Sequence, residues 1–374
     1  MSRGAAPKAK TETLLRQGAP GSAAPTLPPI GCNGRGAQAS SLESPVSLAE
    51  PPIEEQFRLV REAGAFDFFD RLPLPGQVDA YLRCIERFGL PVHTASWFYA
   101  LGRDEPLLAE KLRLASDIGA ASHNIMLYWH DANGRPIADA EVADFYLRAY
   151  DQGMALGVEP AFELHVNMWS EDPRRIAPVA QAVQRRGIPF HFTLDYSHAI
   201  FKIGNPRELA ICGLTQDVAD GRAVLDPFQR GNFVDQWLEM GIVRWLQVRS
   251  VAPNGPRNLW SINDPGSAVA AVPEHSIFPY AAGEPGRGIL YPFAEPAAGE
   301  WHSDWQPQAL ACTREVVRKV LAHHRGHADS PLRWITTEMI NLPDYAHNAR
   351  FSLIAQNAAI AGFVRDTWAA SAPD

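Results

Sequence analysis

The chain has 374 residues, of which 46% are hydrophobic, and it carries a formal net charge of -8 at pH 7. This length suits one barrel-sized domain or two ordinary domains, and a pI of about 5.9 gives no reason to expect a nucleic-acid partner. The sequence lacks a continuous apolar run of the length that a membrane span requires, and its four scattered cysteines indicate reduced thiols in a cytoplasmic protein, without disulfides or a zinc cluster.

The N-terminal segment 1–44 differs in composition from the rest of the chain. It is rich in Ala, Pro, Gly and Ser, and its basic residues outnumber its acids. It has no apolar core of a secretory signal, and its proline content argues against the amphipathic helix of a transit peptide. We therefore predict a disordered tail over 1–44, followed by one folded domain over 45–374.

From residue 45 onward, short apolar runs alternate with amphipathic stretches, which is typical of a parallel sheet built from βα units. Eight such strands with helices between them favour an α/β fold of the (β/α)8 TIM-barrel type over an open doubly wound sheet. The predicted strands are 45–48 (weak), 65–69, 91–97, 122–129, 159–165, 190–195, 242–248 and 332–338. The predicted helices are 54–63, 75–88, 105–118, 139–156, 172–186, 228–240, 306–323 and 348–368.

The segment 250–305, after the seventh predicted strand, interrupts this alternation. It is rich in Pro, Gly and aromatic residues. A loop of this length is usually functional or disordered, and the aromatic content argues against disorder. We expect an inserted loop that acts as a lid over the site. The alternative is a surface insertion that pads the barrel or makes an oligomer contact.

Four side chains that can offer an oxygen atom as a metal ligand lie at the ends of the fifth to eighth predicted strands: Glu163, Asp195, Gln247 and Glu338. Barrel enzymes take their catalytic groups from the carboxyl ends of several strands, and neighbouring strands lie about 5 Å apart, so all four can reach one ion. A single acid in such a place is more often a helix cap or an ion-pair partner, but four together favour a metal centre. Three carboxylates and an amide oxygen are hard ligands that select Mn²⁺ or Mg²⁺, with Co²⁺ or Zn²⁺ as alternatives.

The motifs that end these strands, FELH, LDYSH, LQVRS and TTEM, resemble those of the xylose isomerase-like TIM barrels. This superfamily contains sugar isomerases, ketose 3-epimerases, inosose and 3-dehydroshikimate dehydratases, and endonuclease IV. The resemblance covers roughly residues 50 to 368. In the epimerase-like members the four positions hold Glu, Asp, His and Glu and bind the metal, whereas Gln247 stands here in the third position, a departure that occurs in the dehydratase branches. The resemblance further implies that His198 contacts a substrate oxygen near the metal.

Such a centre performs proton transfer next to a carbonyl. A divalent ion bound to a carbonyl and an adjacent hydroxyl stabilises an enediolate, and Glu163 and Glu338 are the expected groups that remove and return the proton. We therefore predict a metal-dependent sugar or polyol isomerase or epimerase. A dehydratase of the inosose or 3-dehydroshikimate type is the alternative, because loss of a β-hydroxyl from the same intermediate gives a lyase. An endonuclease IV-like hydrolase or a non-catalytic binding subunit ranks third.

Five further residues near the predicted strand ends suit a polyol substrate. Aromatic rings stack on its C–H face and histidines bond its hydroxyls, and Arg249, two residues beyond Gln247, is expected to hold a carboxylate or phosphate bidentately. A packing or ion-pair role is the alternative for each. We expect a carbohydrate-like small-molecule substrate, no nucleic-acid or membrane partner, and assembly into a homodimer or homotetramer. The substrate-binding candidates are His93, Trp97, His130, His165 and Arg249.

Overall fold

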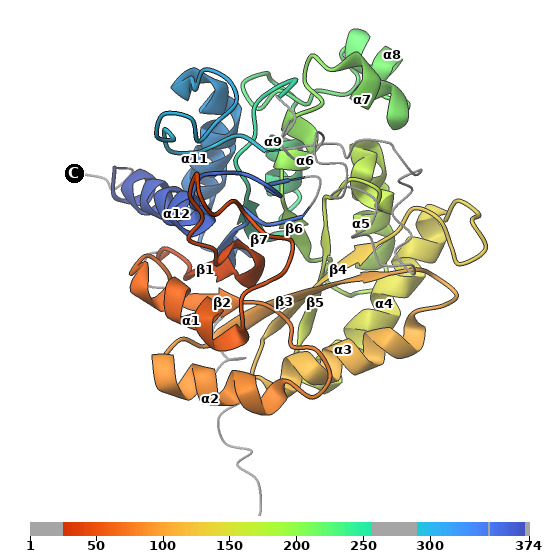
Figure 1. Cartoon of the computed structure of the whole chain (residues 1–374). Helices are drawn as coiled ribbons and strands as arrows, with labels where there is room; N and C mark the ends of the chain where they lie inside the picture. The colour runs from red at the N-terminus through yellow and green to blue at the C-terminus, as the bar shows by residue number, and fades with distance from the viewer. Residues whose placement is uncertain (1–24, 256–289, 343–344, 371–374) are drawn as a thin grey trace, which may run out of the picture.

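The computed structural model describes residues 25–255, 290–342 and 345–370. In these ranges eight parallel strands follow one another around a closed barrel, and the last strand pairs with the first (Figure 1). The predicted (β/α)8 TIM barrel is therefore confirmed. The strands are β1 Ile30–Asn33, β2 Phe68–Asp70, β3 Val92–Tyr99, β4 Ser122–Leu127, β5 Glu159–Glu163, β6 Phe192–Leu194, β7 Val243–Val248 and β8 Trp334–Thr337.

Helices follow the strands and cover the outside of the barrel (Figure 1). Most begin or end within a few residues of the predicted bounds, but the connection from β6 to β7 also contains three short helices that the sequence pattern did not indicate. None of the helices in the described ranges has the length and apolarity needed to cross a membrane. The helices are α1 Ile53–Glu62, α2 Val78–Phe88, α3 Glu105–Asp117, α4 Asp139–Ala155, α5 Ile176–Gln184, α6 Ser197–Ile200, α7 Pro206–Ile211, α8 Thr215–Ala219, α9 Phe233–Glu239, α11 Ala311–Gly326 and α12 Leu353–Ala370, with short 3-10 turns at Gly34–Gly36, Trp169–Glu171, Pro173–Arg175 and Pro307–Leu310.

The first strand lies earlier than the sequence pattern predicts. β1 falls within the segment 1–44, so the predicted boundary at residue 44 is too late, and residues 45–48 belong to the connection between β1 and α1. β1 is short, and its Gly31 is required because a Cβ there would overlap the Phe68 ring of β2. A strand with glycine in place of a β-branched residue resembles a loop in composition. Residues 1–24 of the predicted tail lie outside the described residues.

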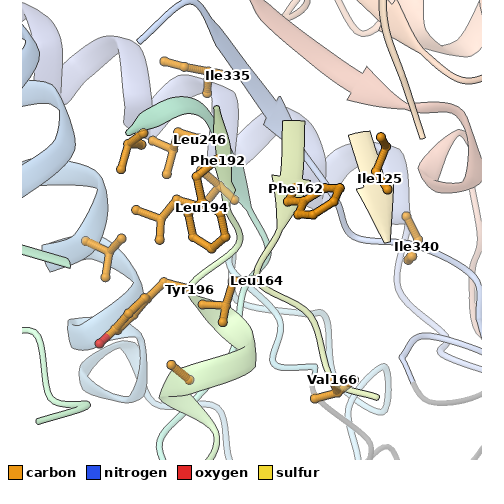
Figure 2. Close-up of a cluster of buried hydrophobic side chains, with 14 of the residues drawn as sticks. Ile125, Phe162, Leu164, Val166, Phe192, Leu194, Tyr196, Leu246, Ile335 and Ile340 are labelled. Atoms are coloured by element: carbon orange, nitrogen blue, oxygen red, sulfur yellow. The ribbon is translucent and has the colours of Figure 1, made fainter. Parts of the chain in front are cut away.

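The hydrophobic core lies between the outer face of the strands and the helices. Figure 2 shows Phe162, Phe192 and Leu246 from β5, β6 and β7 in this layer, and all three are buried. The Phe192 ring lies 5.3 Å from that of Trp237 in α9. Burying a side chain of this size stabilises the fold by about 1.5–3 kcal/mol. These residues therefore keep one face of each strand toward the helices, so that every second residue points into the barrel.

The interior of the barrel is filled at the amino ends of the strands. Phe68, Trp245 and Trp334 form a buried aromatic cluster there, and the indole N–H of Trp245 donates to Thr336 Oγ1 at 2.7 Å. Because this end is closed by rings, buried charged groups converge at the opposite, carboxyl end. Barrel enzymes carry their chemistry at that end.

The insertion after β7 is described from residue 290 onward. Tyr291 donates its backbone N–H to the carbonyl of Ser250 at 3.0 Å, and the Phe293 ring lies 5.6 Å from the Phe363 ring of α12. This part of the insertion therefore contacts the residues that follow β7 and helix α12. The lid prediction otherwise concerns residues 256–289, which lie outside the described ranges.

Candidate metal centre

Three of the four predicted metal ligands meet at the carboxyl end of the barrel. Glu163 is the last residue of β5, and Asp195 and Glu338 follow β6 and β8 directly. One oxygen from each carboxylate lies within 4.8 Å of the others. The side chains are almost fully buried, with 2%, 0% and 8% of their residue surface exposed. Three acids rarely share such a space without a cation.

Glu163 is held by two amides. The side-chain N–H₂ of Asn124, from β4, donates to Glu163 Oε2, and Gln247 Nε2 lies 3.4 Å from Oε1. Burial raises the pKa of Glu163 well above its usual range, and the negative charges of Glu338 and Asp195 raise it further. The neutral acid form of Glu163 is therefore stabilised near neutral pH.

Asp195 is the charged member of the group. Its Oδ1 accepts the Ser197 N–H at 3.1 Å, and its Oδ2 accepts from Arg249 Nη2 at 2.8 Å. Burial opposes ionisation of Asp195, but Arg249 and His198 outweigh it and hold the pKa below its usual range.

Glu338 is bound from two sides. Asn33, the last residue of β1, donates from Nδ2 to Glu338 Oε1 at 3.1 Å, and Arg249 donates to Oε2. Burial raises the pKa of Glu338, Arg249 opposes the shift, and Asp195 adds to it. Asn33 therefore brings β1 into the centre, a contribution that the sequence analysis placed in the tail.

Arg249 lies inside the centre, and its neighbours differ from those expected. From the sequence we expect a guanidinium that holds a substrate carboxylate or phosphate, whereas in the structure Nη2 contacts both Asp195 and Glu338. The guanidinium carbon lies 4.0 Å from the centroid of the Tyr345 ring. Burial disfavours the charged form, but the surrounding acids and Tyr345 raise the pKa of Arg249 well above its usual range.

Two neutral histidines border the acids. His198 Nδ1 accepts the Val166 N–H at 3.3 Å, which leaves the ring proton on Nε2, 3.3 Å from Asp195 Oδ2. Burial lowers the pKa of His198 to about 4. The His165 ring lies 4.2 Å from it and has a pKa well below its usual range, mainly through burial. Both predicted residues are therefore beside Glu163, and both are uncharged at neutral pH.

The other three substrate-binding candidates lie elsewhere. His93 is near the amino end of β3, where a register shift turns its ring against Phe68 and Trp334, at 5.2 and 5.0 Å. Trp97 faces outward, and the Lys111 ammonium of α3 lies 4.4 Å from its ring centroid. His130 is in the loop after β4, where it pairs with Pro136. The structure places none of these three with the buried acids.

Asp70 is a buried acid that the sequence analysis missed. It ends β2, accepts a hydrogen bond from Thr94 Oγ1 at 2.7 Å, and has a second oxygen without a hydrogen-bond partner among the described residues. Burial raises its pKa to about 7, and Glu338 contributes to the shift. The signal was present in the sequence, since Asp70 closes the apolar run AFDFFD in the same way that Asp195 closes its own strand.

The donor set fits a hard divalent cation. When all three acids are ionised, their negative charge exceeds the positive charge of the Arg249 guanidinium that binds two of them. Gln247 Oε1 is buried and has no hydrogen-bond partner within the described residues, and Nε2 of the same amide lies 3.4 Å from Glu163 Oε1. An unpaired amide oxygen beside three carboxylates is the ligand chemistry of Mg²⁺ and Mn²⁺. Glu163, Asp195, Gln247 and Glu338 would hold the ion.

Comparisons with known proteins agree with this architecture. No family model matches the chain, and no curated protein matches it. Among solved structures, a xylose isomerase-like TIM barrel protein from Mycobacterium smegmatis, in complex with magnesium, is 11% identical with a TM-score of 0.51, over 91% of this chain and 98% of that one. L-ribulose 3-epimerase is 12% identical with a TM-score of 0.50, over 92% of this chain and 95% of that one.

At these identities the likeness shows the fold. The chain shares its TIM-barrel fold with these two proteins. A fold of this kind supports many reactions, so activity has to be argued from the site.

Proposed function

We propose that the protein is a divalent-metal-dependent isomerase or epimerase that acts on a sugar or a sugar-like polyol or keto compound. The observation that carries the proposal is the convergence of the three buried carboxylates Glu163, Asp195 and Glu338, with the side-chain amide of Gln247 beside Glu163. Two proteins of the same fold are named as a magnesium complex and as a 3-epimerase, which agrees with this assignment. Mn²⁺ or Mg²⁺ is the expected ion.

The chemistry of such a centre is the movement of a proton next to a carbonyl. A divalent cation would stabilise the negative charge that develops on the carbonyl oxygen when the neighbouring C–H loses its proton. Glu163 has a raised pKa, which suits a group that takes and returns a proton near neutral pH. Glu338 comes from the other end of the β5–β8 series and is the second proton-transfer group. Return of the proton from the other side, or to the other carbon, gives epimerisation or isomerisation.

The surrounding residues orient the substrate and exclude water. His198 carries its proton on Nε2, beside Asp195 and 4.0 Å from Glu163 Oε1, and is therefore placed to donate to a substrate oxygen. Burial of the acids lowers the local dielectric, which strengthens each electrostatic interaction with the developing charge.

A metal-dependent dehydratase is the second candidate. Gln247 favours it, because the sequence resemblance gives His at this position in epimerase-like proteins and Gln in dehydratase branches. The two reactions share the first proton abstraction and differ in whether a β-hydroxyl then leaves.

The test measures metal content and proton exchange together. We expect about one Mn, Mg or Co per chain in the purified protein and loss of that metal in Glu338→Gln. Ketoses, inososes and dehydroshikimate are then incubated in D₂O and followed by NMR. Deuterium uptake without loss of water supports the isomerase or epimerase, whereas a new C=C bond supports the dehydratase. Absence of bound metal under every supplementation would contradict both.

A further inference from the structure

Arg249 uses one nitrogen to bind two of the proposed metal ligands. Its Nη2 donates to Asp195 Oδ2 at 2.8 Å and also to Glu338 Oε2. At most 2% of the surface of Arg249 and of Asp195 is exposed, and 8% of the surface of Glu338 is exposed. A guanidinium nitrogen shared between two carboxylates occupies the place that a divalent ion needs if it is to bind the same two oxygens.

We propose that Arg249 and a divalent cation alternate at Asp195 and Glu338, so that metal uptake releases the guanidinium toward the substrate. This inference rests on the metal centre of the proposed function. The ion requires the same lone pairs at about 2.0–2.6 Å. A doubly charged ion next to a guanidinium in a buried site also adds strong repulsion between like charges. Both effects disfavour simultaneous binding.

The guanidinium keeps one contact after its release from the two carboxylates, the contact with Tyr345. Its central carbon lies over the Tyr345 ring, 4.0 Å from the centroid, in a cation–π contact that does not involve the two carboxylates. Arg249 Nε and Nη1 have no hydrogen-bond partner among the described residues. Once Nη2 is free as well, the side chain offers several donors at the edge of the metal centre. A substrate oxyanion or carboxylate is the ligand that this arrangement recognises.

Arg249 is expected to affect stability and metal affinity in opposite directions, whereas a purely structural ion pair would affect both in the same direction. In the metal-free protein Arg249 neutralises adjacent acids, so its removal lowers stability. In the metal-bound protein it is a displaced competitor, so its removal raises metal affinity. A structural arginine that only shapes the ligands would weaken both stability and metal binding when it is removed.

The experiment is a Mn²⁺ titration read by the EPR signal of free Mn²⁺, without substrate. The proteins are the unmodified chain, Arg249→Met, Arg249→Lys and the control Arg244→Met, whose side chain binds Glu159 near the amino ends of β7 and β5. We expect Arg249→Met to bind Mn²⁺ at least tenfold more tightly and Arg244→Met to bind as the unmodified chain does. Equal or weaker binding by Arg249→Met would overturn the proposal.

Arg249→Lys keeps the result interpretable if Arg249→Met does not fold, because lysine retains the charge but presents one compact ammonium. We expect its Mn²⁺ affinity to lie above that of the unmodified chain, and a lower affinity would contradict alternation. The titration also separates this inference from the proposed function. Absence of Mn²⁺ binding in all four proteins overturns the metal centre itself, whereas binding of equal strength in all four overturns only the role of Arg249.

Discussion

Arg249 and Asp195 form a buried ion pair at the carboxyl end of the barrel, with Nη2 and Oδ2 2.8 Å apart. Asp195→Asn removes one of the two carboxylates that bind Arg249 Nη2, while Glu338 still pairs with the guanidinium, and the loss of a hydrogen bond to a charged group typically costs about 1.5–3 kcal/mol. We therefore expect Asp195→Asn to lower the free energy of unfolding by that amount in urea denaturation. The control is Asp220→Asn, since Asp220 pairs with Arg222 on the surface and its loss should leave stability nearly unchanged. Equal effects of the two substitutions would contradict the buried pair.

Glu163 and Glu159 stand at opposite ends of β5 and allow a matched test of the site. Glu163→Gln should lower turnover by at least about 10²-fold, because it removes a proton-transfer group. The fold should persist, since the side chain of Asn124 can rotate its unpaired Oδ1 toward the new amide. Glu159→Gln weakens the contact with Arg244, 2.9 Å away, and should lower stability without lowering turnover. Full activity of Glu163→Gln would exclude the proposed mechanism.

Asp70 makes stability depend on pH. Its pKa is raised from 3.8 to about 7, so the folded protein binds this proton more tightly than the unfolded chain does. The stability contributed by protonation is present at low pH and is lost as pH rises from about 4 to 7. The amide that replaces the carboxyl group in Asp70→Asn does not ionise, so this side chain stays neutral at every pH. We expect the melting temperature of this variant to exceed that of the unmodified protein at pH 8, and the difference to shrink toward pH 4. A difference that is independent of pH would show that Asp70 titrates normally.

Lys202 ties together the loops that follow β5 and β6. Its Nζ lies 2.8 Å from Glu171 Oε1 and 3.8 Å from Glu208 Oε2, and all three side chains are only 2% exposed. Lys202→Met leaves two buried carboxylates without their shared cation and should cost about 3–5 kcal/mol of unfolding free energy. Lys319→Met is the matched control, because Lys319 and its partner Asp235 are 23% and 36% exposed. In a denaturant titration, Lys202→Met should lower the free energy of unfolding more than Lys319→Met does.

The sequence predicts strands well where apolar runs are long, and the site follows from those strands. Glu163, Asp195 and Glu338 were found because each directly ends an apolar strand, and the structure brings them together. β1 was missed because four residues with a glycine carry no periodic signal. Missing β1 also removed Asn33 from the candidate site, although it donates to Glu338.

Side-chain direction explains the remaining errors. Trp97 was placed in the site because it lies near the end of a predicted strand, but it pairs in register with Ile125 of β4, which faces the outer core. His93 lies beside the register shift between β2 and β3, which simple alternation does not anticipate. The partners of Arg249 come from the connections that follow β6 and β8, and one of them, Tyr345, is more than ninety positions away in the chain. Local spacing contains no information on such contacts.

The pairing of β1 with β8 has a consequence for synthesis on the ribosome. Gly31 lies opposite Thr336, and Asn33 reaches Glu338 across 305 positions of the chain. β1 can therefore pair along this edge only after β8 has emerged from the ribosome. Premature termination before β8 therefore yields a sheet with two open edges and an incomplete set of acids, a product prone to pair with other chains and to be cleared by proteases.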